Sequence, residues 1–383
     1  MHSVKKILII SHDANLNGAP ILLIRLMKIL REHGYTFNTI LRNGGPLANR
    51  FKALSDVFGY FKEPSRKSLL SKLNKRLRGR EKTFDWEGYI KGVDLVLNNT
   101  ITNGAILNVI KKNYDGPVIT YIHELHMGEA LYTTPALVNM TLRVSKYFLV
   151  PSDAVKRHIE KTYSIPNDSV SCLNYYVPSS SSTLANEEAK LVLINNNITA
   201  SFIVGGIGTP GWRKGTDIFL QVAAEVFKKL SDADIQFVWM GAHAADIEAR
   251  KMRYDIEKLG FDKKIVLLDA SLDTAPFFKS IHILLLPSRE DAYPLVMLEA
   301  AAEKAPTICF ENSGGAPEFI CPDAGAVVPY LDIEAMADAV FNYYKHNELI
   351  NFHGEAASEK VKRLHQDERL VIKQFNDAIL KLF

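Results

Sequence analysis

The stretch LLPSREDAYPLVMLEAA, residues 285–301, shows on a small scale how the whole chain is built. An apolar run over 281–286 predicts a buried strand, and the polar residues 287–293 predict a turn. Helical spacing then predicts a helix over 294–303, where Pro294 suits the first turn because its missing N–H needs no partner there. A strand, a turn and a helix in this order are typical of α/β proteins.

Two acids frame the start of that helix. Asp291 lies in the turn, and Glu299 lies about a turn and a half inside the helix. Free backbone N–H groups and the helix dipole favour an anion at such a terminus, and a carboxylate can accept two ribose hydroxyls. The pair therefore predicts a ligand site, with a helix-terminal acid plus a solvent-facing glutamate as the plain alternative.

The same alternation of strands and helices extends along the chain. Helices are expected at 19–33, 217–230, 246–259 and 294–303, and strands at 6–11, 36–41, 95–97, 118–122, 147–150, 202–205, 235–240, 265–268, 281–286 and 307–310. Strands separated by helices predict parallel sheets covered on both faces. The fold class is therefore α/β, with two Rossmann-like parallel-sheet domains and the active site in the cleft between them.

The pattern stops around 176–188, and a serine-rich run over 177–183 predicts a linker there. The predicted domains are 1–180, 181–362 and a final helical segment 363–383. An apolar face on that last helix is expected from Leu370, Val371, Phe375, Ile379 and Leu380.

Composition limits the class of protein. With 383 residues, of which 47% are hydrophobic and 23% charged, the chain suits two globular domains. A net charge of +3 is too small to indicate nucleic-acid binding. Cys172, Cys309 and Cys321 lack metal-binding spacing and fit a reducing compartment. The apolar run 7–10 is short for a signal peptide, and no stretch approaches the ~20 apolar residues of a membrane span, so we expect a cytoplasmic protein.

A basic segment over 65–82 departs from this ordinary composition. It holds eight Lys and Arg residues, and Leu69, Leu70, Leu73 and Leu77 recur at helical spacing. A basic amphipathic helix can lie on an anionic membrane surface. A solvated helix whose leucines pack on its own domain is the other interpretation.

Glycines follow the strand expected at 202–205. Gly206, Gly208 and Gly211 formally match the dinucleotide-binding fingerprint. The match is weak, because Pro210 stands in the tight turn and the acid near the required distance, Glu225, falls inside a helix.

The same loop suits a diphosphate better. Gly208 and its neighbours let the backbone approach a ligand closely, and Arg213 and Lys214 stand side by side just before a helix. A guanidinium binds phosphate in bidentate fashion, and an ammonium acts as a compact charge. A solvated surface pair is the alternative.

The run His123-Glu124-Leu125-His126 follows the strand expected at 118–122. Its histidines are not spaced as in the metalloprotease helix, and a third metal ligand is lacking. His123 is therefore predicted to orient or hydrogen-bond a substrate hydroxyl, or else to be structural.

Together these residues resemble the retaining GT-B glycosyltransferases of family 4. The resemblance is carried by Gly208-Thr209, Trp212-Arg213-Lys214-Gly215, the run 287–300 and the run 312–318, which occur in the family's order. It is specific in the second half of the chain and loose in the first. The family has two glutamates where this chain has Asp291 and Glu299, and the Asp291 side chain is shorter by one methylene.

The resemblance implies a role for each site residue. Glu299 holds the nucleotide ribose, Lys214 neutralises the diphosphate, and Arg213 substitutes for the arginine that the family often has at Thr209. Residues that meet the donor sugar or phosphates are Gly18, Gly208, Asp291, Ala292, Tyr293, Pro294 and Leu295. His123 lies near the donor sugar and acceptor, and the final helix crosses back onto the first domain.

The implied reaction moves a sugar from a nucleotide-sugar donor to a glycan or lipid-linked acceptor, as in polysaccharide biosynthesis. No second carboxylate is clearly placed as a covalent nucleophile, which favours same-face attack with the leaving phosphate taking the acceptor proton. No metal or other cofactor is expected, because Arg213 and Lys214 replace it. Two alternatives stay open: a nucleotide-sugar-binding pseudoenzyme and a GT-B-shaped epimerase.

Overall fold

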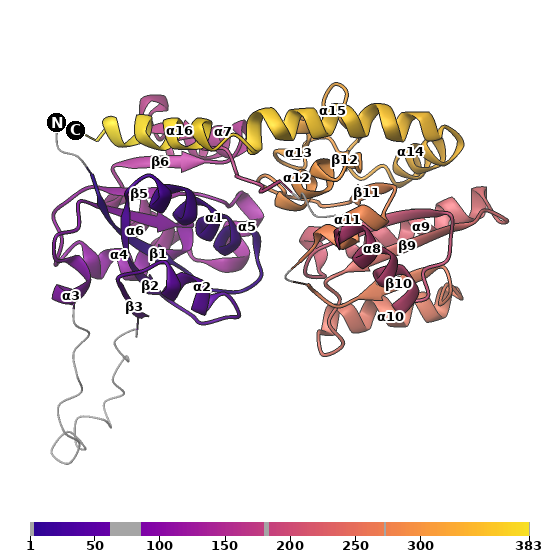
Figure 1. The fold of residues 1–383 in the computed structure, drawn as a ribbon, viewed down its shortest axis with the longest axis horizontal. Coiled ribbons are helices and arrows are strands. Elements are labelled where there is room, and N and C mark those ends of the chain that lie inside the picture. The colour runs from indigo at the N-terminus through magenta and orange to yellow at the C-terminus, as the bar shows by residue number, and fades with distance from the viewer. Residues whose placement is uncertain (1–3, 62–85, 180–183, 272, 383) are drawn as a thin grey trace, which may run out of the picture. The chain divides into compact units, whose positions relative to one another are not determined.

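The computed structural model describes residues 4–61, 86–179, 184–271 and 273–382, and the chain forms two compact units (Figure 1). The N-terminal unit comprises Met1–Val150, Ile159–Leu173 and Ile372–Phe383, and the C-terminal unit comprises Pro151–His158 and Asn174–Val371. The predicted domain bounds at 180 and 362 stay predictions. The basic segment 65–82 lies outside the described residues, so neither interpretation of it is tested.

The N-terminal unit is built on a parallel sheet with the order β3-β2-β1-β4-β5-β6-β7. The order reverses between β1 and β4, which pair directly. The strands are β1 Lys6–Ser11, β2 Thr36–Leu41, β3 Val57–Tyr60, β4 Leu95–Asn99, β5 Val118–Tyr121, β6 Tyr147–Val150 and β7 Val170–Cys172.

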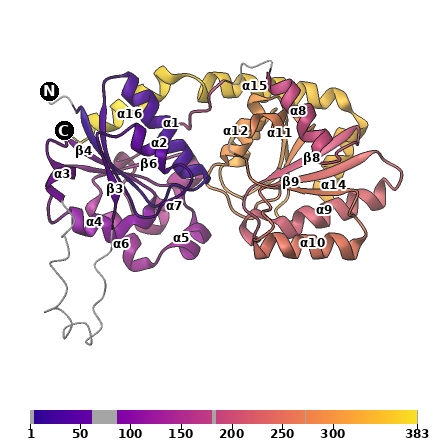
Figure 2. The same ribbon diagram turned by 60° about the horizontal axis from the view of Figure 1, so that its bottom comes forward.

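Helices cover this sheet, as Figure 2 shows. They are α1 Gly18–Glu32, α2 Ala48–Ala53, α3 Trp86–Ile90, α4 Gly104–Ile110, α5 His126–Tyr132 and α6 Pro135–Val144, with 3-10 turns at Ile101–Asn103 and Asn167–Ser169. The helix α7 Asp153–Tyr163 belongs to this unit from Ile159 onward. The last helix, α16 Glu368–Leu380, ends in this unit: its Phe375 packs edge-on against Tyr35 at 6.0 Å, and the Tyr35 hydroxyl donates to Asn376. Leu380 was predicted on its apolar face but is 62% exposed, because it lies at the helix end.

The C-terminal unit repeats the plan with the parallel order β10-β9-β8-β11-β12-β13. Here the order reverses between β8 and β11. The strands are β8 Phe202–Ile207, β9 Ile235–Met240, β10 Ile265–Leu268, β11 Ile283–Leu286, β12 Thr307–Phe310 and β13 Gly325–Val328. Its helices are α8 Leu184–Asn195, α9 Thr216–Lys229, α10 Ile247–Leu259, α11 Ala275–Ser280, α12 Leu295–Ala302, α13 Ala316–Ile320, α14 Ile333–Lys345 and α15 Asn347–His365, with a 3-10 turn at Trp212–Lys214.

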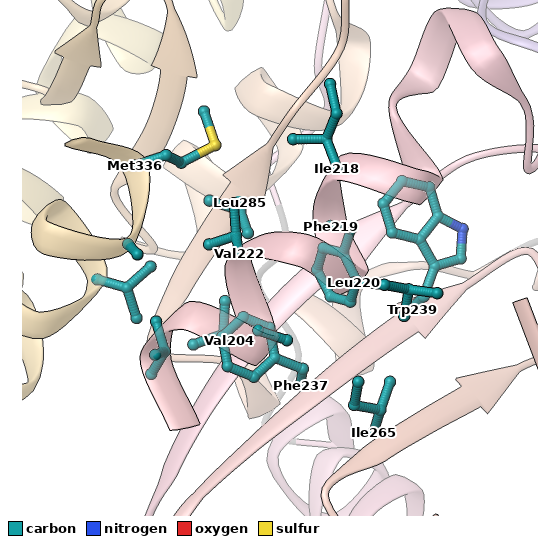
Figure 3. Close-up of a cluster of buried hydrophobic side chains, with 14 of the residues drawn as sticks. Val204, Ile218, Phe219, Leu220, Val222, Phe237, Trp239, Ile265, Leu285 and Met336 are labelled. Atoms are coloured by element: carbon teal, nitrogen blue, oxygen red, sulfur yellow. The ribbon is translucent and has the colours of Figure 1, made fainter. Parts of the chain in front are cut away.

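An aromatic cluster fixes α9 on the sheet of this unit (Figure 3). Phe219 of α9 packs edge-on against Phe237 at 5.5 Å and against Trp239 at 5.0 Å, and all three side chains are buried. Such edge-to-face pairs each contribute about 1 kcal/mol beyond burial. Because α9 is anchored in this way, the loop that enters it from β8 has a fixed end.

The predicted pair of Rossmann-like parallel sheets is confirmed, with local differences. The edge strands β3, β7 and β13 were not predicted, because each is short and carries a glycine or a serine in place of a continuous apolar run. The predicted interruption of the strand–helix pattern over 176–188 is wrong from Leu184 onward, where α8 begins.

Candidate functional site

In open parallel sheets, ligands bind beyond the carboxyl ends of the strands, where the strand order reverses. In the C-terminal unit that point lies between β8 and β11. Arg213 and Lys214 lie in the loop after β8, and Asp291 lies in the loop after β11. In the N-terminal unit, the loops after β1 and β4 flank the corresponding point, and His123 follows β5, the strand beside β4.

Glycines let β8 and the loop after it pass close to their neighbours. A Cβ on Gly206 would lie 2.4 Å from the Trp239 ring, and a Cβ on Gly215 would lie 2.0 Å from the carbonyl oxygen of Pro287. Gly215 also has a φ of +68°, which L-residues rarely adopt. The Gly208 carbonyl accepts a hydrogen bond from the Trp239 indole at 2.9 Å. The loops after β8 and β11 are therefore in direct backbone contact at Gly215 and Pro287.

The loop does not have the geometry of a dinucleotide fingerprint. Gly211, the third glycine, precedes a 3-10 turn over Trp212–Lys214, and α9 begins only at Thr216. The third glycine of a true fingerprint lies where the helix begins and packs on the strand. The weak match found in the sequence therefore lacks its structural context.

The predicted cations and the first acid come together in one cluster. The Lys214 ammonium forms a close ion pair with Asp291 Oδ2, and Arg213 Nη1 lies 3.9 Å from Asp291 Oδ1. The Arg213 guanidinium also donates to the Glu290 carbonyl at 2.8 Å. The three side chains expose between 12% and 24% of their surface. The cluster is thus largely desolvated, and it holds two cations against one carboxylate.

Burial and the neighbouring charges of opposite sign have opposite effects on the pKa of Lys214, and they also have opposite effects on the pKa of Asp291. Burial lowers the pKa of Lys214, although the Asp291 carboxylate opposes that shift. Burial alone would raise the pKa of Asp291, but Lys214 and Arg213 together lower it. Asp291 is therefore ionised at neutral pH, and it lies between two basic side chains.

The backbone around Asp291 is clamped from another loop. The Asp291 N–H donates to the Ser313 carbonyl at 2.7 Å, and the Gly315 N–H donates to the Asp291 carbonyl at 3.1 Å. The following carbonyl, of Ala292, accepts from the Ser152 hydroxyl at 2.7 Å. These bonds set the position of Asp291 before any ligand arrives.

Arg289 is a residue of this region that sequence reasoning missed. Its guanidinium donates to both carboxylate oxygens of Asp217, at 2.8 and 2.7 Å, and to the Trp212 carbonyl at 2.7 Å. It also stacks on the Trp212 ring at 5.0 Å. Arg289 thereby ties the loop after β11 to the turn that carries Arg213. The partners are 72 residues apart in the chain, and no spacing pattern announces them.

The predicted residues after Asp291 differ in how they are placed. Ala292 and Leu295 are buried, and Pro294 stands at the N-cap of α12, one residue before the helix rather than in its first turn. The Tyr293 hydroxyl lies 3.2 Å from Nε2 of His365 at the end of α15. His365 Nδ1 is 2.8 Å from the Tyr175 carbonyl and must donate to it, so Nε2 accepts from Tyr293.

Burial lowers the pKa of His365 to about 4, so its ring is neutral at neutral pH. Sequence reasoning missed this histidine, because its contact with Tyr293 spans 72 residues.

Glu299, the second acid, is half-buried on α12. Its Oε2 lies 3.2 Å from the Thr274 hydroxyl, just before α11. Thr209 is exposed beside Gly208, and its predicted substitute Arg213 lies in the cationic cluster.

In the N-terminal unit, Gly18 is the first residue of α1 and His123 follows β5. His123 Nε2 lies 2.8 Å from Asn99 Oδ1, and the Asn99 amide donates to the Ala19 carbonyl at 3.1 Å. Because the amide nitrogen faces Ala19, the Oδ1 atom accepts from His123, whose Nε2 must carry the proton. Burial, with a contribution from His12, lowers the pKa of His123 to about 3, so the imidazole is neutral.

Within the described ranges, no group of three or more His, Cys, Asp or Glu side chains could hold a metal ion. No helix in the described part of the chain has the length and apolar content to cross a membrane. A cavity of about 740 Å³ in the C-terminal unit is lined by residues such as Gln236, Arg253 and Lys263, and it includes none of the predicted site residues.

Comparison with known proteins gives matches of sequence and of fold. Residues 200–346 match the model of a family described as glycosyl transferases group 1. The lipopolysaccharide core biosynthesis mannosyltransferase LpcC of Rhizobium leguminosarum is 24% identical over 166 residues, 42% of this chain and 46% of that protein. An exopolysaccharide phosphotransferase of Streptomyces coelicolor is 29% identical over 134 residues, 34% of this chain. The match spans about half of the first relative and 14% of the second.

Solved structures match nearly the whole chain. A glycosyltransferase from Rickettsia africae superposes with a TM-score of 0.75 at 17% identity and covers 99% of both chains. HepE of Anabaena, in complex with UDP and glucose, superposes with a TM-score of 0.80 at 14% identity, and the match covers 98% of this chain and 99% of HepE. WaaG, a glycosyltransferase involved in lipopolysaccharide biosynthesis, superposes with a TM-score of 0.70 at 14% identity, and the match covers 98% of this chain and 99% of WaaG. The predicted GT-B fold is confirmed.

Proposed function

We propose that the protein is a glycosyltransferase that uses a nucleotide-sugar donor. The GT-B fold and the match of residues 200–346 to the glycosyl transferases group 1 model support this proposal. The observation that supports this best is the cluster of Arg213, Lys214 and Asp291 at the point where the strand order reverses. An arginine and a lysine side by side in a largely desolvated cluster suit the diphosphate of such a donor.

The donor would bind to the C-terminal unit by several contacts. Lys214 and Arg213 would meet the diphosphate, and Glu299 would hold the ribose hydroxyls. Asp291, held in place by the Ser313 and Gly315 backbone, would meet hydroxyls of the donor sugar. Tyr293 would contribute its backbone rather than its hydroxyl, which His365 already binds.

We propose a retaining, metal-independent transfer by same-face attack. Negative charge grows on the diphosphate as the bond to the sugar breaks, and a preorganised, largely desolvated pair of cations stabilises that charge. Asp291 is a poor candidate for a covalent nucleophile, because its carboxylate is paired with Lys214. The departing phosphate would then take the proton of the attacking hydroxyl.

His123 would contribute hydrogen bonding rather than charge. Its neutral imidazole has a low pKa and a defined tautomer. Such a ring suits a sugar hydroxyl, because a hydroxyl donates and accepts but carries no charge to be matched.

For the acceptor we propose a glycan or lipid-linked glycan, as in polysaccharide biosynthesis. Support comes from the relatives, which are described as a lipopolysaccharide core mannosyltransferase and an exopolysaccharide phosphotransferase. A cytoplasmic protein with peripheral membrane contact through the basic segment 65–82 fits this proposal.

The first experiment screens UDP-, GDP- and ADP-sugars for binding by ligand-observed NMR, then for transfer or slow donor hydrolysis. Lys214→Ala and Glu299→Ala should each lower turnover at least about tenfold, as expected for lost charge-assisted contacts. Lys229→Ala is the matched control, because Lys229 forms an ion pair with Asp338 outside the cluster. Unchanged turnover in both site variants, with folding intact, would rule out this site.

Two other outcomes identify the alternatives. Donor binding without turnover in the wild type, across the acceptors offered, would make the protein a binding protein. An isomerised nucleotide sugar as the product would make it an epimerase.

A further inference from the structure

A buried carboxylate in the N-terminal unit has no role in the proposed donor site. Glu124 is 8% exposed and follows His123 directly. Its Oε2 atom accepts from the Ile101 N–H at 3.2 Å and from the His123 N–H at 2.9 Å, and the Thr100 hydroxyl also hydrogen-bonds to the carboxylate. One oxygen atom thus joins the loop after β4 to the loop after β5.

The loop after β4 is strained where Glu124 holds it. Thr100 has a φ of +88°, a region that a β-branched residue rarely adopts. Its N–H donates to the Tyr121 carbonyl at 2.8 Å, and its own carbonyl accepts from the Asn98 amide at 2.8 Å. A strained backbone of this kind persists only where its surroundings over-determine it, and such residues cluster at functional sites.

The strained turn and the carboxylate stand beside the same pair of side chains. Asn99 immediately precedes Thr100, and His123 immediately precedes Glu124. Asn99 Oδ1 accepts from His123 Nε2 at 2.8 Å, and this bond sets the tautomer of the imidazole. Glu124 therefore fastens the backbone at both ends of the Asn99–His123 contact.

We propose that Glu124 is a positioning residue, which holds the Asn99–His123 pair in the orientation and tautomer that the imidazole needs to meet a sugar hydroxyl. The catalytic consequence rests on the proposed glycosyltransferase function, whereas the effect on His123 itself does not.

The charge around Glu124 fits a geometric role rather than an acidic one. Burial raises the pKa of Glu124 to about 7, and the hydrogen bonds from Ile101, His123 and Thr100 oppose that rise. The Glu129 carboxylate on α5 raises the pKa further. Both protonation states keep an oxygen that accepts from the two N–H groups, so the position of this oxygen matters more than its charge.

The test compares variants that separate the oxygen from the charge. Glu124→Gln keeps an acceptor oxygen and removes the charge, and Glu124→Met removes the acceptor at similar length. Glu124→Asp keeps the charge but draws the oxygen back by one methylene. Glu129→Gln makes the same chemical change at another buried carboxylate, which instead accepts from the Tyr163 hydroxyl.

The first readout needs no activity. The imidazole ¹⁵N shifts of His123, assigned by their loss in His123→Asn, report which ring nitrogen carries the proton. Glu124→Met and Glu124→Asp should move both shifts towards a mixture of tautomers, whereas Glu124→Gln and Glu129→Gln should leave them near those of the wild type. If Glu124→Met does not fold, Glu124→Asp still decides the matter. A folded Glu124→Asp with wild-type shifts overturns the proposal.

The second readout is the split between kcat and KM. Glu124→Met or Glu124→Asp should lower kcat about tenfold or more, with the donor KM within about twofold, because the proposed contacts of the ribose and the cations for the diphosphate lie in the other unit. Glu124→Gln should keep kcat within about threefold. Equal losses in Glu124→Gln and Glu124→Met would overturn a role for the oxygen. A wild type without transfer activity would contradict the proposed function, while the ¹⁵N shifts would still test Glu124.

Discussion

Replacing Glu124 by glutamine should remove a pH dependence from the stability of the N-terminal unit. The carboxyl has a pKa of about 7 in the folded protein, against 4.5 as its ordinary value, and burial is the main cause. Between these two values the folded state holds the proton and the unfolded state has released it. Stability is therefore greatest below the lower value and falls as the pH rises towards the higher one.

The size of the effect follows from the shift. About 2.5 pKa units at about 1.4 kcal/mol per unit give about 3 kcal/mol of stability, lost between roughly pH 4.5 and 7. Glutamine carries no proton to release. The stability of Glu124→Gln relative to the wild type should thus rise by about 3 kcal/mol between pH 4 and 8.

Hydrogen exchange followed by mass spectrometry is a suitable assay, because it reports on each unit separately. Peptides that cover β4 and β5 should show the effect, after correction for the pH dependence of the intrinsic exchange rates. Peptides that cover β8 and β9 in the other unit serve as an internal control and should not differ between the two proteins. Parallel pH profiles for β4 and β5 in both proteins would refute the assigned burial and pKa of Glu124.

Two predictions concern the C-terminal unit. Lys214→Met and Asp291→Asn should each destabilise this unit by about 3 kcal/mol. Lys214→Met leaves Asp291 with only the longer contact to Arg213, at 3.9 Å, and Asp291→Asn leaves Lys214 without a carboxylate. The double variant should lose less than the sum of the two, urea unfolding of the four proteins gives the coupling free energy, and additive losses would show that the ion pair is not formed. Gly215→Ala should lower the melting temperature more than Gly260→Ala. Both glycines have a φ of +68°, but an added Cβ meets a carbonyl only at Gly215. Equal decreases in melting temperature would mean that the backbone strain of a positive φ, about 1 kcal/mol, explains both changes.

The sequence predicted most of what is local in the chain. Strands such as β1 and β9 stand at their predicted bounds, because their apolar runs are bounded by polar turns. Arg213 and Lys214 were found because they are adjacent, in a loop marked by glycines. The edge strand β13 was missed, because it begins with Gly325 and its apolar run is short and only partly buried.

Contacts between distant parts of the chain could not be predicted in this way. Arg289 reaches Asp217, and His365 reaches Tyr293, across 72 residues in each case. Nothing in the local composition of either segment announces its partner. The role of Glu124 was missed for a related reason, since its importance lies in the strained turn at Thr100 rather than in its own neighbours in sequence.

The ion pair of Lys214 and Asp291 changes what the sequence implied about these two residues. As separate motifs they suggested separate tasks, a cation for the diphosphate and an acid for the sugar. In the structure the two groups contact each other, so in the proposed site a donor would compete for Lys214 or share it with Asp291. The clamped backbone holds the Asp291 carboxylate against the ammonium, and burial desolvates the Lys214 side chain. In the proposed reaction this pairing would fix the position of the cation before the leaving group departs.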